Sequence, residues 1–443
     1  MKTLIYYGFI VFTVLGCTKK TIVSKSYDKS KLEFDSIKVI TIDQGQKKIG
    51  PCEPTISINP KNVNHIVAGA VLDNVYLSKD GGASWEKSQM KSPHGVYGDP
   101  VVRFTISGFP LFAHLSNSVG MAYNSVEFLD RIVVHHSIDG GHTWNDGNFP
   151  KVDHSKDQDK EWLAVAPDGT ILMSWTEFDK YGSKNLTDRS RILFSKSVDS
   201  GLTWSDAIVI SELSGDCLDD DNTPEGAHPC IGLDGTYYIA WSYNGKIYLD
   251  VSKDMGKSWL RNDIVVTNQI GGWSFTVPSI GRCNGMPVMK CDLSNEKYRG
   301  RLYISYSDQT NGDNDTDIWL VYSDDKGISW SKPVKVNNDA GHKHQFFSWM
   351  DVDHSNGNIY SVFYDRRNYD DDSTDVYLAY STDGGLSFSN IKISDTPFLA
   401  DGRVFFGDYN DISAVNGIIR PIWTRQDGEI LSVQTAIINA KKK

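Results

Sequence analysis

The sequence predicts an all-β protein in which seven antiparallel sheets stand as blades around one axis, a seven-bladed β-propeller. Three observations predict it: a turn motif found six times, a strand pattern before each copy, and two similar strands at the chain ends. The motif reads Ser-x-Asp-x-Gly-x-Ser/Thr-aromatic. Its copies are 78–85, 137–144, 197–204, 252–259, 323–330 and 381–388. Their spacing of 55 to 71 residues suits one four-stranded blade per copy.

The residue types of the motif suit a tight turn. An Asp accepts hydrogen bonds from the backbone ahead of it, Gly supplies a positive φ, and the aromatic residue fills the apolar seam of the blade. These copies resemble Asp boxes, also called BNR repeats, and the chain after residue 35 resembles the sialidase-like propeller superfamily. The resemblance implies the fold. It does not name a reaction, because one fold hosts many activities.

The strand pattern before each box gives the blade count. In the third unit, apolar strands at 162–165, 171–175 and 191–194 are separated by turns and lead into the box. After the sixth box the pattern occurs once more, at 412–415, 418–423 and 429–437, without a box. Because a three-stranded blade would leave an open edge, we expect residues ~34–44 to supply its fourth strand. A six-bladed ring is the alternative.

The N-terminus resembles a bacterial lipoprotein signal. A basic start, an apolar run over 4–15 and the sequence Val14-Leu15-Gly16-Cys17 predict a signal peptide over 1–16 and a lipid on Cys17. A tether over 17–33 then leads to a single propeller domain over 34–443. These features place the protein in the bacterial cell envelope, held at the membrane by its lipid anchor. A plain signal peptide with an incidental cysteine is the alternative.

Composition excludes some partners and leaves the cysteines open. The formal net charge of -11 and the pI near 5.5 argue against nucleic-acid binding. A monomer is expected. In an oxidising compartment, the sequence neighbours Cys217 and Cys230, and Cys283 and Cys291, are expected to form two structural disulfides, with Cys52 left over; free thiols are the alternative.

A functional site is expected where loops meet at the mouth of the ring, on the face opposite the boxes. Carboxylates, arginines and tyrosines stand at the starts of the first strands and the ends of the second strands. The catalytic candidates are Glu53, Asp99, Glu161, Glu177, Asp365, Tyr364 and Tyr409. The substrate-binding candidates are Arg366, Arg367, Arg425, His344 and Asp408. An alternative reading is that these groups neutralise one another in a water-filled mouth.

The sialidase resemblance implies an exo-acting glycoside hydrolase for an acidic glycan or glycoprotein. Such enzymes hold a substrate carboxylate with arginines and use a tyrosine nucleophile with carboxylates as acid and base. The chain departs from sialidases where their Arg-Ile-Pro motif belongs, since it reads Cys52-Glu53-Pro54 there. A non-catalytic propeller that binds a glycan or protein is therefore the first alternative. A polysaccharide lyase using His344 and Arg425 is the second.

No cofactor or metal is predicted. Acidic loops at 216–221, 313–317 and 370–375 carry enough oxygen atoms for a structural calcium ion. They match no defined calcium-binding pattern, and solvated acidic loops are the simpler interpretation.

Overall fold

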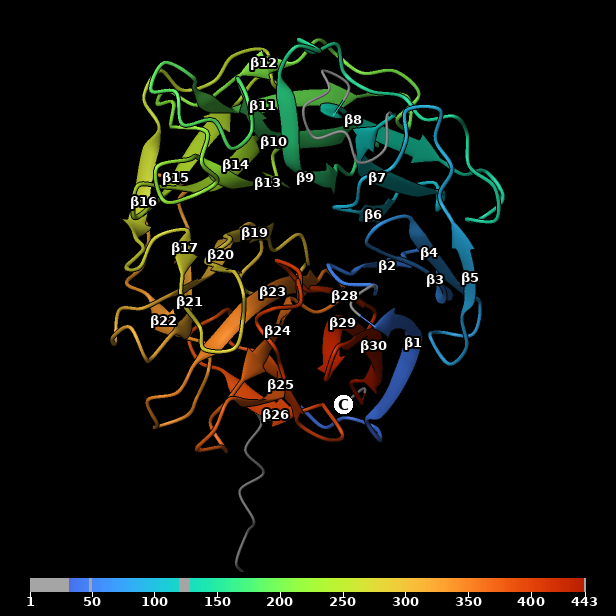
Figure 1. Ribbon diagram of the computed structural model, residues 1–443, viewed down its shortest axis with the longest axis vertical. Helices are drawn as coiled ribbons and strands as arrows, with labels where there is room; N and C mark the ends of the chain where they lie inside the picture. Colours follow the sequence, from blue (N-terminus) through green and yellow to red (C-terminus); the bar gives the residue numbers. More distant parts are fainter. Residues whose placement is uncertain (1–31, 48–49, 119–127, 442–443) are drawn as a thin grey trace, which may run out of the picture.

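The computed structural model describes residues 32–47, 50–118 and 128–441, which form a closed ring of antiparallel sheets (Figure 1). Blade 1 contains β2 (Thr55–Asn59), β3 (Asn62–Ala70), β4 (Asn74–Ser78) and β5 (Glu86–Gln89). Blade 2 contains β6 (Val101–Phe104), β7 (Pro110–Asn117) and β8 (Phe128–His136). Blade 3 contains β9 (Asp157–Val165), β10 (Ile171–Phe178), β11 (Ser190–Ser197) and β12 (Ile208–Val209). Blade 4 contains β13 (Glu225–Ile231), β14 (Tyr237–Tyr243), β15 (Lys246–Ser252) and β16 (Ile264–Asn268).

The other half of the ring follows the same plan. A short hairpin of β17 (Ser274–Phe275) and β18 (Cys283–Asn284) precedes blade 5. Blade 5 contains β19 (Val288–Cys291), β20 (Leu302–Asp308), β21 (Asp317–Ser323) and β22 (Val334–Lys335). Blade 6 contains β23 (Gln345–Asp353), β24 (Asn358–Asp365), β25 (Ser373–Ser381) and β26 (Ser389–Lys392), and β27 (Phe398–Leu399) also pairs with β25. Blade 7 contains β28 (Asp411–Val415), β29 (Ile418–Asp427), β30 (Ile430–Asn439) and β1 (Lys38–Lys47).

The two chain ends close the last blade, as the sequence predicts. β1 pairs with β30 in antiparallel register, with Lys38 opposite Ile437 and Ile40 opposite Thr435. The two strands lie side by side in Figure 1, one blue and one dark red. The seven-bladed prediction is confirmed, and the six-bladed alternative is wrong because the last unit forms a full sheet. Blade 2 departs from the plan, since its fourth strand is reduced to a single bridge between Val134 and Asn148.

The six Asp-box turns share one hydrogen-bond pattern. In the first, Asp80 Oδ1 accepts the Ser84 N–H at 2.9 Å and the Ser78 hydroxyl at 2.9 Å, while Oδ2 accepts the Ser84 hydroxyl at 2.6 Å. The other five aspartates make the same three contacts. Because every side-chain oxygen of these carboxylates holds the turn, the boxes are structural, as predicted.

A backbone bulge lies where each of several first strands begins. In blade 3 the register passes from Asp159 opposite Thr176 to Trp162 opposite Ser174, so β9 holds one extra residue. The first bulged residue, Lys160, has φ of 58°. Blades 4 and 6 repeat the bulge, with positive φ at Gly226 and Phe347. A bulge re-aims side chains and bends the strand, and here it turns its residues toward the axis.

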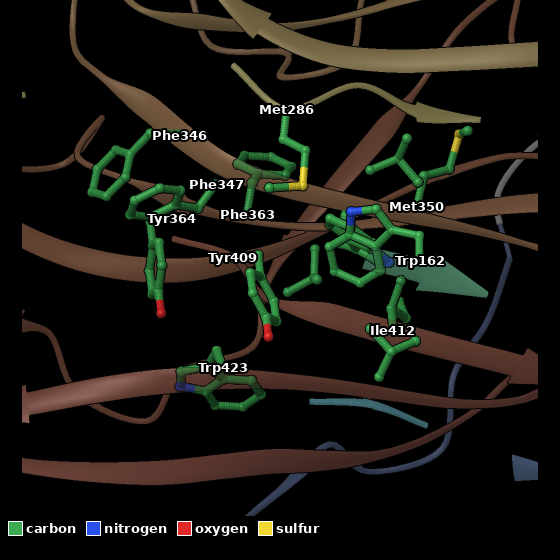
Figure 2. Close-up of a cluster of buried hydrophobic side chains, with 14 of the residues drawn as sticks. Trp162, Met286, Phe346, Phe347, Met350, Phe363, Tyr364, Tyr409, Ile412 and Trp423 are labelled. Carbon is green, nitrogen blue, oxygen red and sulfur yellow. The ribbon is translucent and has the colours of Figure 1, made fainter. Parts of the chain in front are cut away.

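Beyond the bulge, alternate residues of the first strands face the axis, because side chains on a strand alternate between faces. The first axial layer is closed by aromatic rings. Trp162 lies 4.3 Å from Trp349 and 5.1 Å from Tyr409 between ring centroids, and His228 stacks on Trp162 at 5.9 Å. Figure 2 shows Trp162 and Tyr409 in this buried cluster. The aromatic layer separates the two ends of the axis.

The predicted disulfides are not formed, and all five cysteines of the described chain are free and buried. Cys230 and Cys291 lie in one apolar cluster under blades 4 and 5, whereas Cys283 belongs to a different cluster. The pairs that are close in sequence are therefore separated by the packing of the blades. Cys17 and the predicted signal peptide and tether up to residue 31 lie outside the described residues.

Candidate functional site

A cavity of about 750 Å³ lies at the mouth of the ring, on the face opposite the Asp boxes. Its polar floor comes from the strand starts of blades 1, 2 and 3, at Glu53, Asp99 and Lys160, and its far wall from 281–282 and 402–407. The rim mixes apolar and basic side chains: Leu72 and Phe405 are about half exposed, and Lys180 and Arg403 also line the cavity. The cavity therefore combines buried charged groups with a partly apolar opening, as ligand sites commonly do.

Three charged residues occupy equivalent positions in consecutive blades. Glu53 and Asp99 both have φ of 51°, and Lys160 has φ of 58°. This left-handed region is uncommon for residues other than glycine, and such strain gathers at functional sites. The corresponding positions of blades 4, 6 and 7 hold Gly226, Phe347 and Gly407. The charge is thus confined to one side of the mouth.

An ionic network links these residues across the axis. Lys160 Nζ lies 3.1 Å from Asp99 Oδ2 and 3.2 Å from Asp408 Oδ2. The Asp408 N–H donates to Glu53 Oε1 at 3.1 Å. Arg282 donates from Nε to Asp408 Oδ1 at 2.9 Å and also contacts Asp408 Oδ2 through Nη2. Asp408 therefore ties the glutamate, the lysine and the arginine into one unit.

A second carboxylate extends the network toward the cavity wall. Arg282 Nη1 donates to Asp219 Oδ2 at 2.6 Å, and the Tyr181 hydroxyl donates to the same oxygen at 2.8 Å. The Arg282 side chain is 40% exposed, which leaves part of its guanidinium facing the cavity. It is the cation of the network that a ligand can reach, since Lys160 is only 4% exposed.

Several carboxyl groups of the site have raised pKa values. Burial, assisted by the charge of Asp99, raises the pKa of Glu53 to about 8. The same two causes raise the pKa of Asp159 to about 7, and burial raises the pKa of Glu161 well above its usual range. Burial alone would lower the pKa of Lys160, but the charges of Asp99, Glu53 and Asp159 outweigh it and raise that pKa. At neutral pH the site thus combines a protonated carboxyl with a fixed cation.

The three arginines expected to bind substrate lie away from this cavity. Arg366 is buried, 3.3 Å from Asp372 and over the Phe346 ring. Arg367 pairs with Asp365 at 2.6 Å, which also engages that catalytic candidate in a structural ion pair. Arg425 pairs with Asp427 at 2.7 Å and donates to backbone carbonyls. None of these three substrate-binding candidates lines the cavity, because each guanidinium is held by an aspartate of its own blade.

Other predicted candidates are held inside the protein. Tyr409 belongs to the aromatic layer, with its hydroxyl 3.3 Å from the Pro100 carbonyl oxygen. Tyr364 donates to the Thr424 carbonyl at 2.6 Å. Glu177 is paired with Arg191 at 2.7 Å. Both tyrosine hydroxyls and this carboxylate are thus occupied by structural contacts.

Two further candidates are buried without reaching the cavity. His344 lies 3.0 Å from Thr316 Oγ1, and burial with the charge of Arg366 lowers its pKa to about 4. Glu161 follows Lys160 in the bulge, and neither of its carboxylate oxygens has a hydrogen-bond partner among the described residues. It lies behind the floor of the cavity, where burial favours its protonated form.

The sequence analysis identified part of the site and missed the rest. Glu53 and Asp99 line the cavity and Asp408 joins its network, as expected. Arg282 and Tyr181 were missed because they lie on loops distant in sequence and outside the strand starts. No pattern in the sequence marked Arg282, since its role depends on meeting Asp408 across the axis.

No group of three or more His, Cys, Asp or Glu side chains within the described ranges is arranged to hold a metal ion. The acidic loops at 216–221 and 370–375 instead use their carboxylates in local contacts, such as Asp219 with Arg282 and Asp372 with Arg366. Nor do these ranges contain a helix long and apolar enough to cross a membrane.

Comparison with known proteins supports the fold and leaves the activity open. No protein-family model matches the chain, and no curated protein matches it. A solved protein of unknown function from Dyadobacter fermentans DSM 18053 is 11% identical with a TM-score of 0.51, covering 91% of this chain and 99% of its own. An ulvan lyase solved with a bound -[GlcA(1-4)Rha3S]- saccharide is 12% identical with a TM-score of 0.52, covering 88% and 95%.

A Hadza microbial sialidase is also similar, at 14% identity and a TM-score of 0.47, with 86% of this chain and 74% of that one covered. At these identities the similarity shows a shared propeller fold and nothing about the reaction. An ulvan lyase and a protein of unknown function both share it.

Proposed function

We propose that the protein is a glycoside hydrolase that cleaves a sugar residue from an acidic glycan in the 750 Å³ cavity. The observation that carries the proposal is a pair of carboxylates, Glu53 and Asp99, at equivalent positions of neighbouring blades. The two carboxyl groups have different surroundings, which suit them to different roles. Glu53 is protonated at neutral pH, whereas Asp99 is ion-paired with Lys160.

Glycosidases need such a pair. One carboxyl group protonates the leaving oxygen, and an ionised carboxylate stabilises the positive charge that develops on the sugar and activates water or attacks directly. In this chain Glu53 is the proton donor, because burial and the charge of Asp99 keep its proton in place. Asp99, 3.1 Å from Lys160 Nζ, is its partner. Lys160, fixed between Asp99 and Asp408, positions that carboxylate.

The cavity wall fits an acidic sugar through Arg282, with Lys180 and Arg403 as further cations of the lining, and through an apolar part of the rim. The exposed part of Arg282 can donate to a substrate carboxylate, since guanidinium groups match carboxylates in geometry. Phe405, half exposed with the Arg282 guanidinium 5.9 Å from its ring centroid, offers a face for the apolar side of a sugar ring. Arg282 thus takes the anion-binding role for which Arg366, Arg367 and Arg425 were the candidates.

The lyase alternative has less support. It needs a base near the substrate carboxylate, and His344 and Arg425 are both committed to contacts outside the cavity. Tyr181 lies at the cavity, but burial and the charge of Asp219 raise its pKa, so its hydroxyl stays protonated and cannot accept a proton from the substrate. The non-catalytic alternative remains a distinct outcome of the experiment below.

The test uses aryl glycosides and oligosaccharides of uronic and sialic acids. The wild-type protein is expected to release free sugar, and Glu53→Gln to lower kcat by about 10²- to 10⁴-fold on natural linkages. The loss should shrink for activated aryl leaving groups, which need no protonation, and a merely structural role would not give this pattern. Asp370→Asn, in a fully exposed loop, is the matched control.

Three outcomes distinguish the alternatives. An unsaturated product would indicate a lyase. Binding without turnover that survives Glu53→Gln would indicate a binding protein. Hydrolysis that is unaffected by Glu53→Gln and Asp99→Asn would contradict the assignment of these carboxylates.

We also propose that a lipid on Cys17 anchors the protein to a bacterial envelope membrane. The described chain begins and ends at the Asp-box end of blade 7, where Phe34 bridges Ala440. A tether from there would direct the Asp-box face to the membrane and the cavity away from it. Several box turns on that face carry strongly exposed aliphatic side chains, including Ile138, Val198 and Ile328.

A further inference from the structure

A second cavity lies on the axis at the Asp-box end, on the far side of the aromatic layer from the proposed active site. Its volume is about 240 Å³, and residues from all seven first strands line it. Trp162, Trp349 and Tyr409 separate it from the larger cavity. The proposed hydrolase reaction makes no use of this space.

Side chains on a strand alternate between its two faces, and this alternation determines which residues surround the second cavity. Two residues beyond the aromatic layer, the next inward-facing positions form a ring around the axis. Six of these seven positions, in blade order from blade 2 to blade 7, are Arg103, Ala164, Cys230, Lys290, Asp351 and Asp411. Two ion pairs confirm the layer, since Arg103 lies 3.1 Å from Asp411 and Lys290 lies 3.2 Å from Asp351.

The charges of the ring are unevenly distributed. Both carboxylates stand together on blades 6 and 7, and both also accept backbone N–H groups. Asp411 Oδ2 accepts the Ile56 N–H at 3.0 Å, and Asp351 Oδ2 accepts the Ala414 N–H at 2.8 Å. The two cations stand apart on blades 2 and 5. Each cation is paired with one of these carboxylates, so the four charges balance, and the side of blades 3 and 4 holds no charged group of the ring.

That side is also where the ring has room. Blades 3 and 4 contribute only Ala164 and Cys230, two small side chains, between the long side chains of Arg103 and Lys290. Both cations keep partial exposure, 14% for Arg103 and 21% for Lys290. Because small residues flank the space, the cationic groups can reach a ligand placed there.

A buried imidazole closes this space from above. His228 of blade 4 is 2% exposed, lines the cavity, and has no hydrogen-bond partner on either ring nitrogen among the described residues. A buried polar group without a partner is costly, and it indicates a missing ligand or water. Burial and the charges of Lys290 and Arg103 lower its pKa well below the usual range, so a neutral ring with one N–H donor faces the cavity.

We propose that this axial cavity binds a small anion, a halide or a short carboxylate, between Arg103 and Lys290 and beneath His228. Two cations and a neutral donor line one cavity on the axis, and charge-assisted hydrogen bonds to an anion are stronger than hydrogen bonds between neutral groups. The same cations would repel a metal ion. The anion would complete the hydrogen bonds of His228 and link blades 2, 4 and 5 across the axis.

The test uses bromide in crystals and acetate in solution. Crystals of the whole protein soaked in sodium bromide should show an anomalous peak on the axis between Arg103 and Lys290, and calorimetry should detect acetate binding. Lys290→Met with Asp351→Asn keeps the charge balance of the ring and should lower both affinities at least tenfold. Arg103→Lys keeps the pair with Asp411 and should weaken binding less.

Arg282→Met, at the other cavity, separates the two sites. It should leave the axial bromide peak and the acetate affinity unchanged. The proposal is overturned if the wild-type axis shows no bromide, if the Lys290 double variant binds as the wild type does, or if Arg282→Met abolishes acetate binding. His228→Phe, folded as judged by its melting temperature, must also weaken acetate binding.

Discussion

Replacing Glu53 with glutamine tests whether the buried carboxyl holds its proton in the folded protein. Its pKa rises from an ordinary value of 4.5 to about 8, through burial and the charge of Asp99. One pKa unit corresponds to about 1.4 kcal/mol, so the rise corresponds to roughly 5 kcal/mol. Because the folded state binds the proton more tightly, this stability is fully present below pH 4.5 and is lost as the pH rises through 8.

Glutamine does not titrate, and its side-chain oxygen can still accept the Asp408 N–H that Glu53 Oε1 accepts. Urea unfolding of both proteins between pH 5 and pH 9 measures the difference. Relative to Glu53→Gln, the wild type should lose roughly 4 kcal/mol of unfolding free energy across this range, most of the full effect. Titrating groups far from Glu53 cancel in the comparison. A difference that stays constant with pH would refute a protonated Glu53.

The activity should follow the same proton, falling on the alkaline side with an apparent pKa near 8. A profile of kcat against pH checks this, and a flat alkaline limb would contradict Glu53 as the acid.

Three further predictions concern the network, the ring closure and the membrane. Lys160→Met should lower the unfolding free energy by about 3 kcal/mol, measured in urea, because it leaves buried carboxylates such as Asp408 without their lysine. Deleting residues 34–47 should expose the edge of β30 and cause concentration-dependent association in analytical ultracentrifugation. Ile328→Asp, on the Asp-box face, should reduce the fraction of the unlipidated domain that sediments with anionic vesicles. The control variant Leu186→Asp, on a loop at the cavity end, should not. Equal effects of the two variants would contradict the proposed orientation.

Most of the fold could be predicted from local sequence motifs. The boxes are held by contacts within eight residues, as in Ser78 to Trp85, so a reader of the sequence can recognise each turn and count the blades. The match between the 34–42 and 388–394 strands was sufficient to place the closing strand beside β30. Turns and strands of this kind depend on residues that are close in sequence, so the residue types in the sequence are enough to predict them.

The site depended on contacts between blades. Glu53 and Asp99 were found because the starts of first strands can be located from the pattern. The ends of second strands can be located too, but the three arginines there pair within their own blades. The bulges that place Lys160 beside Asp99 have no separate sequence signal. Arg282 and Asp408 are 126 residues apart in sequence.

The sequence by itself determined seven repeating sheets, their order and the strand that closes the last one. It could do so because each repeat contains its own turn residues and its own alternating strand pattern. Only the tertiary structure decided which charged groups meet. Ring closure brings residues of blades 7, 1, 2 and 3 onto one floor and removes them from water, and that burial raises the pKa of Glu53. Charge pairing and desolvation act through space, and a linear pattern of residue types does not record the distances on which they depend.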